Sequence, residues 1–202
     1  MNPFDTKAKE WDANPAHMER TEAIAQAMRR HVPLSRSMRA LEVGAGTGLL
    51  SFALREELGP ITLTDTSEGM LAVLRDKIAM QGIPHMTPVH VDLATETLSE
   101  GSFDLIYLQM VLHHIPNVDG ILSKFRDLLA PGGFLCIADL EKEDGSFHGE
   151  GFAGHHGFET TALAAQVAYA GFESPSVETV YDLHREGHGR PFPVFLMTAK
   201  RA

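Results

Sequence analysis

The chain has 202 residues, of which 44% are hydrophobic and 22% are charged, a balance typical of one globular domain rather than of a disordered segment. Its 17 basic and 27 acidic residues give a formal net charge of −10, which disfavours nucleic acid and anionic lipid as partners. The single cysteine, Cys136, excludes an intramolecular disulfide and a metal cage built from thiolates.

The N-terminal residues 1–7 are polar and charged where a signal peptide would be apolar. No apolar run approaches the ~20 residues that a membrane span needs. We therefore expect a cytoplasmic protein without a membrane partner. No pattern in the sequence indicates an oligomeric state.

Helix-forming and strand-forming segments alternate along most of the chain. A helix rich in Ala, Met and Ile is expected first, over residues 15–31. Apolar runs typical of strands follow at 40–43, 61–64, 88–91, 103–108 and 134–138. Segments with helical periodicity lie between them at 47–58, 67–82 and 121–129. Such alternation predicts βαβ units, and therefore a parallel sheet with helices on both faces.

The C-terminal part departs from this alternation. A helix is expected over residues 161–170, followed by strands at 176–183 and 192–199 with no helix between them. Two such strands pair antiparallel, so the sheet is expected to be mixed. The predicted fold class is α/β, with a doubly wound, mostly parallel seven-stranded sheet that ends in an antiparallel hairpin.

Three glycines follow the first predicted strand, at Gly44, Gly46 and Gly48, and a helix begins directly after them. A glycine-rich turn lets a ligand approach the backbone closely, and the N-terminus of the helix favours an anionic group. A dinucleotide-binding fold would have the spacing G-x-G-x-x-G. Here the third glycine comes one position early and Leu49 occupies the dinucleotide position, so the motif is a different one.

Two carboxylates follow the next two predicted strands. Asp65 lies 21 residues after Gly44 and ends the second strand, where a carboxylate can accept hydrogen bonds from both hydroxyls of a ribose. Asp92 ends the third strand, and Leu93 beside it offers apolar surface. These residues are expected to form one nucleoside-sized cleft together with the glycine loop.

With the Pro131–Gly133 turn and the terminal hairpin, this constellation resembles the class I S-adenosylmethionine-dependent methyltransferases, and among them the small-molecule branch similar to ubiquinone-biosynthesis methyltransferases. The resemblance covers residues 39–139 well and the flanks loosely. It implies a Rossmann-like fold, S-adenosylmethionine as cofactor and S-adenosylhomocysteine as product. Residues 1–38 would be a helical arm that closes over the cofactor, 39–140 the cofactor-binding core and 159–202 a C-terminal helix and hairpin.

The resemblance also implies roles for individual residues. Asp65 would hold the ribose, Asp92 would accept from the adenine amine, and Gln109 would stand near the methionine carboxylate or the sulfonium. Adenine would be contacted by Thr66, Met70 and Leu93. The methionine part of the cofactor would be contacted by Glu42, Gly44, Ala45 and Gly46, and the lid over the cofactor would include Trp11.

Histidines mark the side where a substrate would enter. His113 and His114 follow the fourth strand, and one of them could act as a base or an orienting group. The aperiodic segment 141–158 carries His148 and His156 and is expected to be a substrate lid. Imidazole and carboxylate groups in this segment suit zinc or iron, but no fixed ligand spacing supports a metal site, so none is expected.

The sequence therefore predicts an enzyme that transfers a methyl group from S-adenosylmethionine to a small-molecule acceptor by in-line displacement, without naming that acceptor or a catalytic residue. The aromatic turn with two prolines that is typical of nucleic-acid amino-methylating enzymes is replaced here by residues 109–112. The alternatives are an NAD(P)-dependent oxidoreductase on a Rossmann fold, a catalytically inactive cofactor-binding protein, and a metal-dependent hydrolase.

Overall fold

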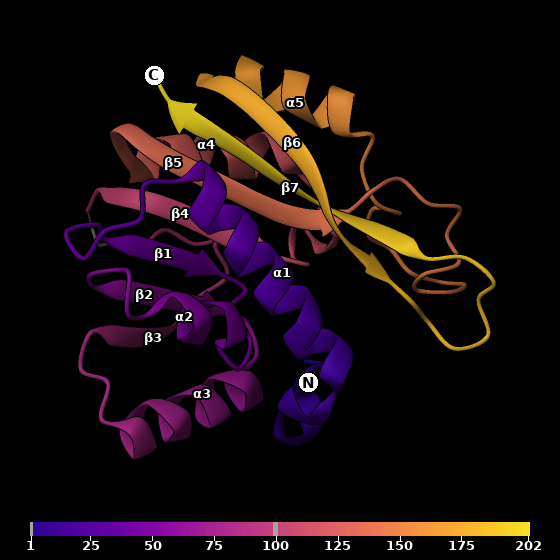
Figure 1. Cartoon of the computed structure of the whole chain (residues 1–202), viewed down its shortest axis with the longest axis horizontal. Helices are drawn as coiled ribbons and strands as arrows, with labels where there is room; N and C mark the ends of the chain where they lie inside the picture. The colour runs from indigo at the N-terminus through magenta and orange to yellow at the C-terminus, as the bar shows by residue number, and fades with distance from the viewer. Residues whose placement is uncertain (1, 99–100) are drawn as a thin grey trace.

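The computed structural model describes residues 2–98 and 101–202, and its strands form one seven-stranded sheet (Figure 1). The strands are β1 (Ala40–Val43), β2 (Ile61–Asp65), β3 (Met86–His90), β4 (Phe103–Gln109), β5 (Leu129–Leu140), β6 (Phe172–Leu183) and β7 (Phe192–Arg201). Their order across the sheet is β3-β2-β1-β4-β5-β7-β6. β1 to β5 pair in parallel, whereas β7 lies antiparallel between β5 and β6. The predicted fold class is confirmed.

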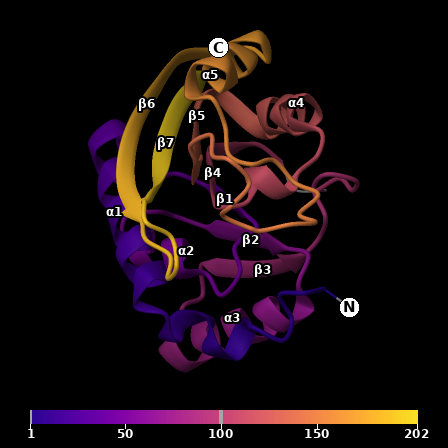
Figure 2. The same cartoon turned by 90° about the vertical axis from the view of Figure 1, so that its right-hand side faces the viewer.

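Helices cover both faces of this sheet, as the alternation predicts (Figure 2). They are the 3-10 helices η1 (Ala8–Ala13) and η2 (Leu112–His114) and the α-helices α1 (Pro15–His31), α2 (Leu49–Leu54), α3 (Glu68–Gln81), α4 (Val118–Leu128) and α5 (Thr160–Tyr169). The side chains of α1, α2 and α3 contribute to one buried cluster and those of α4 and α5 to another. Two apolar layers therefore enclose the sheet.

Local signals in the sequence account for the helix ends. The Ser67 side chain accepts a hydrogen bond from the Met70 backbone N–H and caps α3, which ends at Gly82 in the left-handed conformation. Asn117 caps α4 in the same way, through the N–H of Gly120. Such caps satisfy backbone groups that have no partner within the helix.

Some elements differ in length from their predictions. α2 covers only residues 49–54 of the expected 47–58, and α4 begins at Val118 and ends at Leu128. Residues 131–133, which the sequence predicts as a turn, lie within β5. β5 and β6 begin several residues earlier than predicted, at Leu129 and Phe172. Pairing with neighbouring strands extends them, and a local pattern cannot register that contribution.

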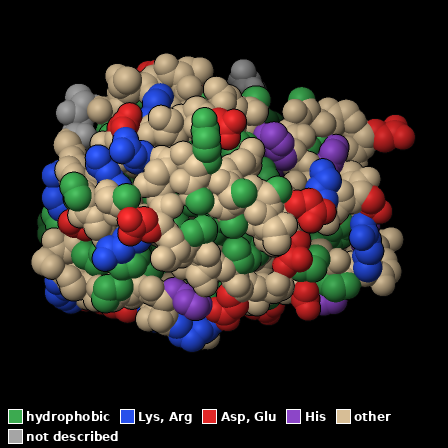
Figure 3. All heavy atoms as spheres, turned by 90° about the horizontal axis from the view of Figure 1, so that it is seen from above, with side chains coloured by type: hydrophobic (Ala, Val, Ile, Leu, Met, Phe, Trp, Pro, Cys, Tyr) green, Lys and Arg blue, Asp and Glu red, His purple; other side chains and the backbone are tan. Residues whose placement is uncertain are grey.

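Charged side chains of both signs are interspersed on the face drawn in Figure 3, with no continuous basic patch over that face. Among the described residues, no helix combines the length and apolar character that crossing a membrane requires.

Two methionines on helices allow a matched test of the packing. Met28 of α1 is fully buried, whereas Met80 of α3 is 86% exposed. We expect Met28→Ala to lower the free energy of unfolding by about 2–5 kcal/mol, because a cavity remains. Met80→Ala should stay within about 0.5 kcal/mol of the wild type. Urea denaturation of the three proteins measures both values, and equal values for the two variants would contradict this packing.

Candidate functional site

The glycine loop after β1 is held by one carboxylate. Gly44, Gly46 and Gly48 all have positive φ angles, of 64°, 56° and 82°, which residues with a side chain rarely adopt. Asp65, the last residue of β2, accepts a 2.7 Å hydrogen bond from the Gly46 N–H through one oxygen and a 2.7 Å bond from the Ser67 N–H through the other. The carboxylate therefore fixes both the glycine loop and the start of α3.

The surroundings of the loop differ from one glycine to the next. A Cβ atom on Gly44 would lie 2.4 Å from the Val111 side chain, so this glycine is required for close packing against the end of β4. A Cβ atom on Gly46 would meet only the Met70 sulfur, at 4.0 Å. Met70 is buried in α3, as expected for a core residue that also borders the loop.

Glu42 lies buried beneath the glycine loop in a small polar network. Its carboxyl group accepts a hydrogen bond from the Ser51 hydroxyl, which also lies 2.5 Å from the Tyr107 hydroxyl. Burial raises the pKa of Glu42 to about 8, against the lowering effect of the Ser51 hydrogen bonds. The group is therefore protonated at neutral pH in the absence of a cation beside it.

Asp92 and Leu93 follow β3, which pairs with β2 in register up to Asp65 and His90. The carboxyl ends of β1, β2 and β3 thus lie side by side, as the cleft requires. The Asp92 oxygens accept hydrogen bonds from the Ala94 N–H at 2.9 Å and the Thr95 hydroxyl at 3.0 Å, which form a local turn. Leu93 is buried.

Polar groups without partners gather where α1 meets the end of β4. Gln109 donates from its amide to the Thr21 hydroxyl at 3.0 Å, while its buried Oε1 atom accepts no hydrogen bond. Arg20 directly precedes Thr21 on α1, and its buried Nε atom also has no hydrogen-bond partner. Burial lowers the Arg20 pKa to about 10, so the guanidinium remains charged at neutral pH. A buried cation favours an anionic partner.

The backbone directly after β4 is strained. Met110, directly after Gln109, has φ = +57° although it carries a side chain. Non-glycine residues in this region cost free energy and cluster at functional sites. The end of β4 therefore has two separate features of a ligand-binding edge.

The N-terminal arm lies against the glycine loop and α3. Asp12 accepts hydrogen bonds from the Thr47 hydroxyl at 2.5 Å and from the Lys77 ammonium at 2.7 Å. Asp5 accepts from the Ser67 hydroxyl at 2.7 Å and from the Gly69 N–H at 3.1 Å. These bonds position the arm over the loop that the resemblance assigns to the cofactor.

Aromatic residues of the arm extend these contacts. Trp11 is half-buried, and its ring lies 4.3 Å from the His17 ring and 6.0 Å from the Phe4 ring. Phe4 in turn meets His114 edge-on at 5.6 Å. Two residues before Phe4, the Asn2 side chain donates a hydrogen bond to the Thr66 hydroxyl at 3.1 Å. The arm therefore contacts both the predicted cofactor residues and the histidine segment.

The first histidine after β4 is part of a buried pair. His113 Nδ1 lies 2.6 Å from Asp139 Oδ1, and the His113 backbone N–H donates to Asp139 Oδ2 at 3.1 Å. Both residues are buried. Because a carboxylate accepts hydrogen bonds, this contact favours the tautomer of His113 that carries its proton on Nδ1, which leaves Nε2 as the acceptor nitrogen.

His114 and His148 lie against this pair. Their rings are 4.1 Å and 4.9 Å from the His113 ring and 5.5 Å from each other. Burial, followed by the nearby His113, lowers the pKa of each to about 4. Both imidazoles are therefore neutral at neutral pH.

The predicted lid segment 141–158 folds over these histidines without a helix or long strand of its own. A bridge between Glu141 and Phe158 closes its base. His155 fastens its far end to the histidine segment, through its N–H to the His113 carbonyl at 2.8 Å and its ring to the Ile115 carbonyl at 3.0 Å.

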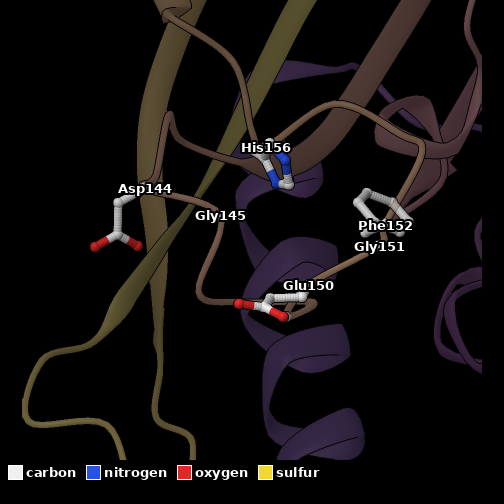
Figure 4. A pocket seen from close by; sticks show the side chains of 7 residues that line it. Asp144, Gly145, Glu150, Gly151, Phe152 and His156 are labelled. Carbon is white, nitrogen blue, oxygen red and sulfur yellow. The ribbon is translucent and has the colours of Figure 1, made fainter.

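A cavity of ≈ 230 Å³ opens within this segment (Figure 4). His156 and Phe152 border it from opposite sides and Glu150 lies below them, while Asp144 points away. His156 Nδ1 is 3.4 Å from the buried Glu143 carboxylate. The four histidines expected on the substrate side thus come together around one loop: His113, His114, His148 and His156. Their role toward a substrate stays a prediction.

Comparison with known proteins relates this geometry to that of methyltransferases. A family model described as a methyltransferase domain matches residues 41–135. These residues contain the glycine loop, Asp65, Asp92 and the histidines after β4. Residues 41–135 are therefore similar to a methyltransferase domain.

Relatives and structures agree with this assignment. The chain is similar to the ubiquinone/menaquinone biosynthesis C-methyltransferase of Cupriavidus necator, with 32% identity over 52% of this chain and 44% of that protein. It is also similar to a polyketide synthase-nonribosomal peptide synthetase of Pyricularia grisea, with 33% identity over 60% of this chain and 3% of that protein. The chain spans only 3% to 5% of the length of the large synthases that it matches. The phosphoethanolamine N-methyltransferase 2 of Haemonchus contortus, solved with S-adenosyl-L-methionine, shares the fold with a TM-score of 0.75 at 17% identity (91% of this chain, 52% of that chain).

Sequence patterns did not indicate Arg20 or Asp139 as site residues. Arg20 is one of several arginines on an amphipathic helix, and Asp139 lies within an apolar strand. The only available signal was an acidic residue near the carboxyl end of the fifth strand, which is the edge where α/β folds place ligands.

The raised pKa of Glu42 leads to a test by pH. In the folded chain the carboxyl group keeps its proton up to about pH 8, whereas in the unfolded chain it loses it near the ordinary value of 4.5. Wild-type stability should therefore fall, relative to Glu42→Gln, as pH rises from about 5 to 8, by on the order of a few kcal/mol. Denaturant unfolding at both pH values measures this. Glu56→Gln, at an exposed position, is the control, and a constant difference between wild type and Glu42→Gln would contradict the assignment.

Proposed function

We propose that this chain transfers a methyl group from S-adenosylmethionine to a small-molecule acceptor. The observation that carries the proposal is the Asp65 carboxylate, which is locked by the Gly46 and Ser67 N–H groups at the carboxyl end of β2, beside a left-handed glycine loop. This is where an open α/β sheet binds the ribose of a nucleoside. The match of residues 41–135 to a methyltransferase family model supports it.

Asp65 retains the capacity to hold a ribose. Its oxygens accept hydrogen bonds from the Gly46 and Ser67 N–H groups, and a carboxylate has about four acceptor sites in all. Adenine would be bordered by residues that follow β2 and β3 and by one residue of α3: Thr66, Asp92, Leu93 and Met70. The Asp92 oxygens likewise have one lone pair each beyond the local turn.

Unpaired polar atoms support a site for the methionine part at the end of β4. The free Oε1 atom of Gln109 suits an ammonium group, and the charged Arg20 suits a carboxylate. Gly44, Ala45 and Gly46 would shape the wall of this site, and the buried Glu42 would lie behind it. An ammonium group near Glu42 would lower its pKa and favour its charged form.

Methyl transfer requires little chemistry from the protein. Bound S-adenosylmethionine would supply an electrophilic methyl group whose leaving group needs no acid. The chain would hold the acceptor in line with that methyl group and exclude water, with the arm and Trp11 over one side and the segment 141–158 over the other. His113, held by Asp139, would lie with the other histidines on the acceptor side.

Several observations favour a small acceptor. The similar proteins include a ubiquinone/menaquinone biosynthesis C-methyltransferase, a polyketide synthase-nonribosomal peptide synthetase and a phosphoethanolamine N-methyltransferase. All three names indicate small-molecule chemistry. The net charge of −10 disfavours a polyanionic acceptor. The proposal includes no nucleic acid and no membrane as partner, and it places the protein in the cytoplasm.

Calorimetric titration tests the proposal directly. We expect S-adenosylmethionine and S-adenosylhomocysteine to bind with a stoichiometry of one and NAD not to bind, because the third glycine comes too early for a dinucleotide. Selective binding of NAD would overturn the proposal in favour of an oxidoreductase. A screen of small acceptors that follows release of S-adenosylhomocysteine then identifies the acceptor, and binding without turnover on any of them would favour an inactive cofactor-binding protein.

Removal of the ribose acceptor gives a second test. Asp65→Ala should weaken binding of S-adenosylhomocysteine by about 1–3 kcal/mol, because the ribose hydroxyls lose a charged acceptor. Asp76→Ala, at an exposed position of α3, should leave the affinity unchanged. Thermal unfolding of both variants distinguishes loss of binding from loss of the fold. Unchanged affinity in a folded Asp65→Ala protein would show that the ribose lies elsewhere.

A further inference from the structure

We propose that His113, His114 and His148 form a binding site for one divalent transition-metal ion, with Zn²⁺ as the first candidate. One ring nitrogen from each residue lies within 4.8 Å of the other two. Imidazole nitrogen is a preferred ligand of zinc, ferrous iron, copper and nickel. The sequence alone predicts no metal here, because two ligands are adjacent and the third is 34 residues further along the chain.

The contact between His113 and Asp139 is the one that metal-binding histidines commonly make. The carboxylate accepts from Nδ1 at 2.6 Å and also from the His113 backbone N–H at 3.1 Å, so it fixes the ring and its tautomer. Ligating histidines usually donate their second ring nitrogen to a carboxylate, which raises the basicity of the ligating nitrogen. Asp139 is fully buried, and its contact with Nδ1 leaves Nε2 as the ring nitrogen of His113 that would bind the ion.

His148 supplies an independent observation. Its Nε2 atom is buried and has no hydrogen-bond partner, which is costly unless a ligand satisfies it. Phe152 stacks on the His148 ring at 3.8 Å with an angle of 16° and therefore holds the ring in place beside His113. The backbone of the segment 141–158 is also fastened at His155, so the ring is not on a free loop end.

The spacing of the three nitrogens allows an ion with a small adjustment. Zn–N bonds of about 2.0–2.1 Å place the nitrogens of a tetrahedral site about 3.4 Å apart. The nitrogens now lie within 4.8 Å of one another, and rotation of the exposed His114 side chain would bring them closer to the spacing of a bound ion. Three protein ligands leave the fourth position open, as in catalytic rather than structural zinc sites.

The open position suggests what the ion would do, and this part of the inference rests on the proposed methyl transfer. A metal ion lowers the pKa of a coordinated S–H or O–H group. A thiol that binds there forms a metal–sulfur bond and releases its proton to solvent, which yields a nucleophilic thiolate. The site therefore favours acceptors with an ionisable thiol or hydroxyl group over amines.

Metal binding is measured on the full chain without a histidine tag. We expect metal-free protein to bind one Co²⁺ or Zn²⁺ per chain, with the visible absorption of tetrahedral Co²⁺. His148→Ala, which removes a loop ligand and leaves the buried pair intact, should weaken binding at least tenfold. Asp139→Asn should weaken it by about 10- to 100-fold, as expected for the partner of a ligating histidine. His184→Ala removes an exposed histidine outside the cluster and should have no effect.

The outcomes separate this site from the proposed function. Absence of stoichiometric binding, or equal weakening by His148→Ala and His184→Ala, would overturn the metal site. Addition of 2-mercaptoethanol to the Co²⁺ form should produce a sulfur-to-cobalt charge-transfer band, and its absence would overturn the open position. Titration of the metal-free protein with S-adenosylhomocysteine reports on the methyltransferase site alone, so failure of one proposal does not imply failure of the other.

Discussion

The two hydrogen bonds that Asp65 accepts determine the shape of the predicted cofactor edge. Burial raises the pKa of this carboxyl group, and the N–H groups of Ser67 and Gly46 oppose that effect. These hydrogen bonds favour the charged form of the carboxyl group. The glycine loop and the start of α3 come from different βα units, and this one side chain holds them together. The arm depends on the same arrangement, because Asp5 binds the Ser67 hydroxyl and the Gly69 N–H.

The parts of the fold that the sequence predicts well are those with local causes. α1 and β1 have the predicted bounds, 15–31 and 40–43, because a proline, a cap or a glycine stands at their ends. The Ser67 cap and the Gly82 stop of α3 are confirmed for the same reason. β5 and β6 are longer than predicted because their first residues contribute no apolar pattern and are ordered by pairing with their neighbours. Strand length is therefore partly a tertiary property.

The candidate site divides along the same line. The loop 44–48, Asp65 and Asp92 can be predicted as site residues from the sequence, because parallel strands present their carboxyl ends at one edge. The sequence does not indicate Arg20 or the pair of His113 and Asp139 as site residues. Their place at the site arises from burial and from contacts across 26 residues or more. A charged residue within a strand or on a helix has no distinguishing pattern before the fold buries it. The histidines were found as residue types, but their grouping around His113 required the structure.

One short segment connects the two halves of the site. The arm contacts the glycine loop and α3 through Asp12 and reaches His114 through the edge of Phe4. Most of these contacts are hydrogen bonds and a ring contact rather than deep apolar burial: Ala8 is the buried residue of η1. Segments with few buried apolar contacts open at low free-energy cost. Displacement of the arm would therefore expose the donor edge and the histidine cluster together, so access to the two sides of the site is physically coupled through this segment.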